Sequence, residues 1–163
     1  MNVAQMRQSA EMYCGVAVED DVLITAVNEA LESIGDLGLI FEEETLTGST
    51  PGTWYVLPVT TTNIVNVFKD GAPYSQWQTR GYEIKFSEAG DYVVTLQKMP
   101  EYVDAGADIP ECHLLFHKAI VTYLRAFIKL TKDDTNQDGH KLMDLFYKEV
   151  ERISAILQRN RKR

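Results

Sequence analysis

The clearest chemical pattern in the sequence is the segment Asp134–Gly139. It reads Asp-Thr-Asn-Gln-Asp-Gly, which fits the first half of an EF-hand calcium loop. The twelfth position of such a loop supplies a bidentate glutamate, but here that position is Leu145, which falls in an apolar stripe. The segment would bind calcium in the millimolar range at best. We interpret it as a turn, since Asp, Asn and Gly commonly form turns and helix caps.

Two histidines, His113 and His117, are four residues apart, so on a helix they would lie on one face beside Cys112 as metal ligands can. The residues between them are Leu114, Leu115 and Phe116, without the glutamate of an H-E-x-x-H site, and the sequence offers no third ligand. We expect both histidines on a helix surface or at a contact between subunits. The sequence predicts no metal site.

Other catalytic patterns are absent from the sequence. It contains no glycine-rich phosphate loop, no G-x-S-x-G elbow and no H-E-x-x-H motif. The run Glu42–Glu44 is interpreted as solvated acids and not as a spaced acid/base pair. We therefore expect a protein that is not an enzyme and uses no cofactor.

The last five residues carry four basic side chains, namely Arg159, Arg161, Lys162 and Arg163. Residues 1–110 hold 5 basic and 17 acidic residues, whereas residues 111–163 hold 11 and 7. The tail is either a solvated helix end or a docking segment for an acidic surface or for nucleic-acid phosphates. We favour a protein partner, because no aromatic stacking platform flanks the basic cluster.

The 163 residues, 45% of them apolar, suit one domain with its own core. No apolar run approaches the roughly 20 residues that span a bilayer, and the first residues lack the layout of a signal peptide, so we expect no membrane contact. The two cysteines, Cys14 and Cys112, are expected as buried free thiols on helices.

Hydrophobic periodicity divides the chain into three parts. Residues 1–36 predict two helices, one from Val3 to Tyr13 that stops at Gly15, and one from Asp20 to Ile34. We expect Asp20 or Asp21 to cap the second helix and Gly35 to end it.

Residues 39–99 predict a small antiparallel sheet, because β-branched and aromatic residues alternate with turn residues. The expected strands are Thr53–Leu57, Ile64–Phe68, Tyr82–Phe86 and Tyr92–Leu96. A tight turn is expected at Asp70-Gly71. The last two strands are expected to form a hairpin, with Tyr82, Ile84 and Phe86 facing the core.

Residues 110–158 predict an antiparallel pair of helices, followed by the basic tail 159–163. The first helix should begin at Pro110, a favoured first helical residue, and the turn Asp133–Gly139 should join it to the second. The first helix has an apolar face of Cys112, Leu115, Phe116, Ala119, Ile120, Tyr123, Leu124 and Phe127, and an opposite polar side of Lys118, Thr122, Arg125 and Lys129. The second helix has a stripe of Leu142, Leu145, Phe146, Val150, Ile153, Ile156 and Leu157. The predicted class is a mainly helical α+β fold with the sheet inserted between the helical parts.

This order of elements resembles the head-to-tail adaptor proteins of tailed bacteriophages, also called connector or head-completion proteins. The similarity covers most of the chain. The segments that carry it are Asp20–Leu23, Ala26–Leu31, Ile34-Gly35, Tyr55–Pro58, Asp70-Gly71, Met99-Pro100, Ile109–Cys112 and Phe146-Tyr147.

The resemblance implies a structural protein of the virion neck, assembled in the host cytoplasm. Copies would form a ring, usually twelve-fold, that joins the portal protein to a stopper or tail protein. DNA would pass through the ring without specific binding, since an acidic lumen repels phosphates. Portal docking would be a role for Arg159, Arg161, Lys162 and Arg163. Two other functions remain open, a calcium-responsive module built on residues 134–139 and a neighbouring neck or tail-completion protein.

Overall fold

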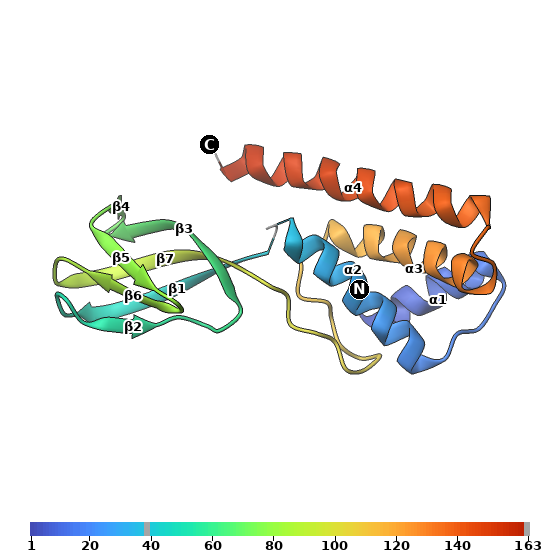
Figure 1. Cartoon of the computed structure of the whole chain (residues 1–163), viewed down its shortest axis with the longest axis horizontal. Coiled ribbons are helices and arrows are strands. Elements are labelled where there is room, and N and C mark those ends of the chain that lie inside the picture. Colours follow the sequence, from blue (N-terminus) through green and yellow to red (C-terminus); the bar gives the residue numbers. More distant parts are fainter. Residues whose placement is uncertain (38–39, 162–163) are drawn as a thin grey trace. The chain divides into compact units, whose positions relative to one another are not determined.

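The computed structural model describes residues 1–37 and 40–161. The chain is an α+β fold with two compact units (Figure 1). A helical unit is formed by Met1–Leu39 together with Pro100–Arg163, and a sheet unit is formed by Ile40–Met99. The inserted position of the sheet, between two N-terminal helices and a C-terminal helix pair, is as the sequence predicts.

The first two helices are α1 (Val3–Cys14) and α2 (Asp20–Asp36). Helix α1 starts with a capping box between Asn2 and Gln5 and ends at Gly15, whose φ of 67° suits a glycine cap. The predicted cap position on α2 is wrong, because Glu19 occupies it and makes no side-chain cap hydrogen bond. Asp21 lies inside the first turn, where its carboxylate accepts a hydrogen bond from the Val22 amide at 2.8 Å. Asp20 pairs instead with the guanidinium of Arg7 on α1. Gly35 does not end α2, which continues through Asp36.

Helix α3 (Phe116–Lys132) is the centre of the helical unit. Figure 1 shows it between α4 (Gln137–Arg161) on one side and α1 and α2 on the other. Because helices cover α3 on several sides, the predicted polar face is wrong for Thr122, which is buried, and for Arg125, which packs over the Tyr13 ring of α1 at 4.6 Å.

The predicted start of the third helix at Pro110 is wrong, since α3 begins six residues later. Pro110 lies in a turn, where its carbonyl accepts a hydrogen bond from the amide of Cys112 at 2.9 Å. A second turn follows, in which the amide of Phe116 donates to the carbonyl of His113. Proline suits a turn as well as a first helical position, and here the turn is formed. Leu115, predicted on the buried face, is therefore exposed.

The sheet unit contains two antiparallel sheets where the sequence predicts one. Four strands pair in the order β1-β7-β3-β4 and three in the order β2-β6-β5. The strands are β1 (Phe41–Ser49), β2 (Trp54–Val56), β3 (Thr61–Lys69), β4 (Ala72–Pro73), β5 (Trp77–Arg80), β6 (Glu83–Phe86) and β7 (Gly90–Lys98). The predicted turn between β3 and β4 is confirmed, with positive φ at Asp70 (51°) and Gly71 (79°).

The core of the sheet unit lies between these two sheets. Phe86 of β6 and Tyr92 of β7 stack with ring centroids 3.7 Å apart and an interplanar angle of 4°. The predicted hairpin between these strands is wrong, because β6 pairs with β2 and β5 whereas β7 pairs with β1 and β3. Ile84 and Phe86 are buried as predicted, but Tyr82, which precedes β6, is 51% exposed.

The acidic run Glu42–Glu44 belongs to β1, an edge strand paired with β7. The carboxylate of Glu42 lies 2.9 Å from the ammonium of Lys98, a side chain that is only 7% exposed. This ion pair gives Glu42 a structural contact, although its side chain remains 40% exposed to solvent.

Candidate partner-binding surface

Helix α4 presents a line of basic side chains on the face turned away from α3. Its members are exposed and follow one another at spacings of seven, four and seven residues: Lys141, Lys148, Arg152 and Arg159. These spacings keep all four on one side of a helix of 3.6 residues per turn. Phe146 and Val150, which are buried against α3, lie on the opposite side. We call this line of four residues the basic face.

Two apolar side chains border the basic face. Leu145 is 44% exposed and Ile156 is 40% exposed, so both are wrongly predicted as members of the buried stripe. Only Phe146, Val150 and Ile153 of that stripe are fully buried, because α3 covers a narrow strip of α4. On the same helix Asp144 and Glu151 are also exposed, so the basic face has apolar neighbours on one flank and acidic ones on the other. Its positive charge is complementary to an acidic surface.

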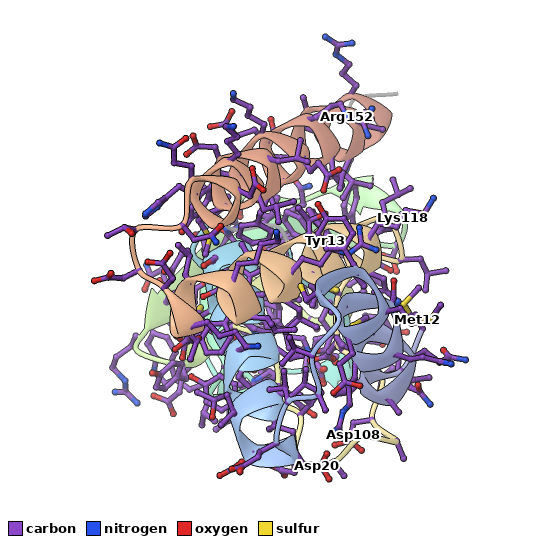
Figure 2. All side chains as sticks on the ribbon, turned by 90° about the vertical axis from the view of Figure 1, so that its right-hand side faces the viewer. Met12, Tyr13, Asp20, Asp108, Lys118 and Arg152 are labelled. Carbon is purple, nitrogen blue, oxygen red and sulfur yellow. The ribbon has the colours of Figure 1, made fainter. Side chains whose placement is uncertain are left out.

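The opposite side of the helical unit is acidic. Figure 2 shows Arg152 on α4 at one side, with Asp20 on α2 and Asp108 on the segment 100–115 at the other. The segment 100–115 also carries Glu101, Asp104 and Glu111. The basic residues near the end of the sequence and the acidic residues before them thus lie on different sides of the helical unit.

The acidic segment is held in place by hydrogen bonds. The side-chain amide of Asn28 on α2 donates to the carbonyl of Val103 at 3.0 Å, and its oxygen accepts from the Val103 amide at 2.9 Å. The Asp108 carboxylate accepts two backbone amides, from Asp104 and Ala105, and these bonds lower its pKa. We call residues 100–111 the acidic segment. It is a formed surface that carries negative charge at neutral pH.

Of the basic residues predicted to dock a partner, Arg159 is the last member of the basic face. Helix α4 continues through Arg161, so Arg159 is a helical residue and not part of a tail that follows the helix. Figure 1 shows the end of α4 extending past the start of α3. The Arg161 side chain, Lys162 and Arg163 lie outside the part that the structure describes. Lys141, Lys148 and Arg152 were missed in the sequence, although their spacing was readable there.

The two histidines do not form a pair. His113 lies in the turn before α3 and is exposed, whereas His117 is buried in α3, so its predicted surface position is wrong. His117 Nδ1 lies 3.0 Å from the Met1 amino nitrogen, and burial lowers the pKa of its ring. Among residues 1–37 and 40–161, no cluster of three or more His, Cys, Asp or Glu side chains is arranged to hold a metal ion.

The EF-hand-like residues serve as a turn and a helix cap. Asp133 accepts hydrogen bonds from the amide and hydroxyl of Thr135, and the Asn136 side chain accepts one from the Gly139 amide at 2.9 Å. Gly139 is already helical and lies against α3, where a Cβ at this position would fall 2.8 Å from two Leu130 side-chain carbons. The glycine of the pattern is needed for helix packing.

Both cysteines are free thiols, as predicted, but each is half-buried. Cys14 is the last residue of α1, and Cys112 lies in the turns before α3 and not on a helix. Burial raises the pKa of both thiols, that of Cys112 to about 12. Neither thiol is an activated nucleophile at neutral pH.

No protein-family model matches this sequence, and no curated protein matches it significantly. The helices in the described ranges include none with the length and apolar character of a bilayer-crossing segment.

Proposed function

We propose that this protein is a head-to-tail adaptor of a tailed bacteriophage, a structural protein without chemistry of its own. In this proposal copies form a ring, commonly twelve-fold, between the portal protein and a stopper or tail protein, and the ring extends the DNA channel. The observation that carries the proposal is the separation of the basic face from the acidic segment on opposite sides of one helical unit.

Opposed charged surfaces favour head-to-tail contact between copies. A surface that binds a different surface of the next copy generates a ring when the rotation between copies closes. The basic face of α4 would contact the acidic segment of the neighbouring copy, with Leu145 and Ile156 adding apolar area at the margin. Electrostatic complementarity of this kind sets the orientation of the contact more than its affinity.

Docking on the portal is assigned to the end of α4 and the residues after it. Arg159 ends the basic face on a part of α4 that extends past α3, and Arg161, Lys162 and Arg163 follow in the sequence. The order of helices and inserted strands supports the proposal through its resemblance to the adaptor family. DNA would pass the ring without specific contacts, because an acidic protein repels phosphates.

Electron microscopy of the full chain mixed with the portal ring of its own virion tests this function. We expect ring density on the portal that disappears at high salt, since exposed charge contacts are screened. A chain lacking residues 159–163 should fold but bind the portal more weakly. Absence of portal-bound density at every salt concentration would show that the protein is not an adaptor.

A further inference from the structure

A cleft with a volume of about 480 Å³ opens in the sheet unit. Residues 61–64 of β3 line one side, and Trp77 and Thr79 of β5 line the other. The cleft is also lined by Leu57, which is buried in the core of the unit, by Gly81 and by the exposed Tyr82. The cleft therefore lies beside the core and is open to solvent.

Both walls of the cleft are strand edges. Strand β3 pairs with β7 along its length, but β4 reaches only Phe68 and Lys69 on its other side. In the part of the chain that the structure describes, no strand pairs with residues 61–66 on that side. Strand β5 is the edge of the three-stranded sheet and pairs with β6 alone. Unpaired strand edges are templates for an added strand.

The open edge of β3 lacks two of the usual protections against strand addition, charged residues and proline. Residues 61–66 read Thr-Thr-Asn-Ile-Val-Asn, with no charged residue and no proline, which are the residues that commonly block such edges. The register with β7 shifts twice in this half of the strand, so that Thr62 and Val65 are extra residues. Bulges bend a strand, and they recur beside binding sites.

The side chains that line the cleft are apolar or uncharged and polar. Trp77 and Thr79 lie on the core side of β5, because they pair across the sheet with the buried Phe86 and Ile84. The Oγ1 atom of Thr61 is buried and has no hydrogen-bond partner. The lining contains no Lys, Arg, Asp or Glu. A ligand that fits must supply uncharged hydrogen-bonding groups and an apolar side chain.

We propose that this cleft binds an extended, uncharged peptide segment of a partner protein, which adds as a strand to the open edge of β3. Backbone amides and carbonyls of the peptide pair with residues 62–66, since the Thr61 amide already donates to the carbonyl of Pro58 at 3.0 Å. One apolar or aromatic side chain of the peptide packs between Trp77 and Tyr82. Such strand addition takes its affinity from main-chain hydrogen bonds and its specificity from pockets for alternate side chains. The site lies in a different unit from the basic face and does not depend on ring formation.

The test uses the full chain with Trp54→Phe, which leaves Trp77 as the one tryptophan in the sequence. The probe is a library of acetylated and amidated octapeptides in which Thr or Ser alternates with Val, Ile or Tyr. We expect members of this library to change Trp77 fluorescence and to shift the amide resonances of residues 61–66. The same peptides with alternate backbone amides N-methylated should bind at least tenfold more weakly, because they cannot donate along the edge.

A matched pair of variants locates the peptide. Thr79→Lys places a charge in the cleft and should weaken binding at least tenfold. Gln78→Lys puts the same charge on the same strand beside Lys85, on the other face, and should leave binding unchanged. The proposal is overturned if no peptide binds, if N-methylated peptides bind equally, if the two variants behave alike, or if a neutral oligosaccharide binds in place of the peptides.

Discussion

The hydroxyl of Tyr123 on α3 donates a hydrogen bond to the carboxylate of Glu29 on α2, at 2.8 Å. Two neighbouring residues of α3 make similar bonds to the other helices. Thr122 donates to Glu149 on α4 at 3.1 Å, and Arg125 donates to Ser9 on α1 at 3.2 Å. One turn of the central helix thus bonds to each of the three helices around it, so its polar residues orient the unit.

Replacing Tyr123 with Phe should lower the free energy of unfolding by about 1 kcal/mol at pH 7, since it removes this hydrogen bond and keeps the ring. Burial and the Glu29 carboxylate raise the pKa of Tyr123 above its ordinary value of about 10. As pH rises past that value, the unfolded tyrosine ionises first and the wild type loses stability. The Phe variant has no hydroxyl to ionise at position 123, so it does not lose stability for this reason.

Urea denaturation of both proteins at pH 7 and at pH 10.5 measures the effect. The stability difference between wild type and variant should narrow at the higher pH, because the other tyrosines titrate alike in both proteins. A difference that is the same at both pH values would show that the Tyr123 hydroxyl ionises as freely in the folded state as in the unfolded state.

Gly139→Ala should destabilise the helical unit, although alanine favours helices. The added methyl would meet Leu130 side-chain carbons at 2.8 Å, and overpacking typically costs about 1–3 kcal/mol, which exceeds the propensity gain of at most about 1 kcal/mol. In a Leu130→Ala background the same change should become neutral or stabilising. Thermal unfolding of the wild type, the two single variants and the double variant tests this. If the changes in stability from the two substitutions simply add, positions 130 and 139 are not in direct contact.

Cys112 should react with iodoacetamide more slowly than Cys14 in the folded protein. A thiol with a pKa of about 12 has roughly one molecule in 10,000 as thiolate at pH 8. Burial also raises the pKa of Cys14, but the nearby charges of Lys129, Arg125 and Lys132 oppose that effect. Timed alkylation followed by mass spectrometry of the peptides gives both rates, with protein in urea as the control in which the rates should converge. Faster labelling of Cys112 in the folded protein would refute this order.

Charge reversal tests the contact between copies. A Lys148→Glu/Arg152→Glu variant makes α4 acidic, and a Glu101→Lys/Asp104→Lys variant makes the acidic segment basic. Each variant alone should fail to form rings on the portal, since like charges would face one another. A mixture should restore rings in which the two variants alternate, visible by electron microscopy. Normal rings from either variant alone, or no rings from the mixture, would show that these two surfaces do not meet.

Helical periodicity located the helices well because each has a buried side that repeats every 3.6 residues. The beginning of α3 was not predictable in this way, since Pro110 and Glu111 suit a turn and a first helical turn equally. The strand partners of β6 could not be predicted from the sequence either. The short connection after Phe86 looks like a hairpin loop, but it carries the chain from one sheet to the other, as the strand pairing shows. The stack of Phe86 on Tyr92 then joins the two sheets across the core.

The basic face was predictable in principle, because the spacing of Lys141, Lys148 and Arg152 can be read from the sequence. The position of the basic face relative to the acidic segment could not be predicted from the sequence. That relation depends on α3 lying between α4 and α2, and on Asn28 holding Val103, which are contacts between residues far apart in the chain.

The two ends of the sheet unit meet, since the amide of Lys98 donates to the carbonyl of Ile40 at 3.0 Å. Helices α2 and α3 pack together although the whole sheet unit separates them in sequence. Once the strands have paired, the inserted residues no longer add to the length of flexible chain that must close for these helices to meet. The entropy cost of loop closure then depends only on the few residues between α2 and β1 and on the segment between β7 and α3. Folding of the insert is therefore expected to speed the docking of the helices that flank it.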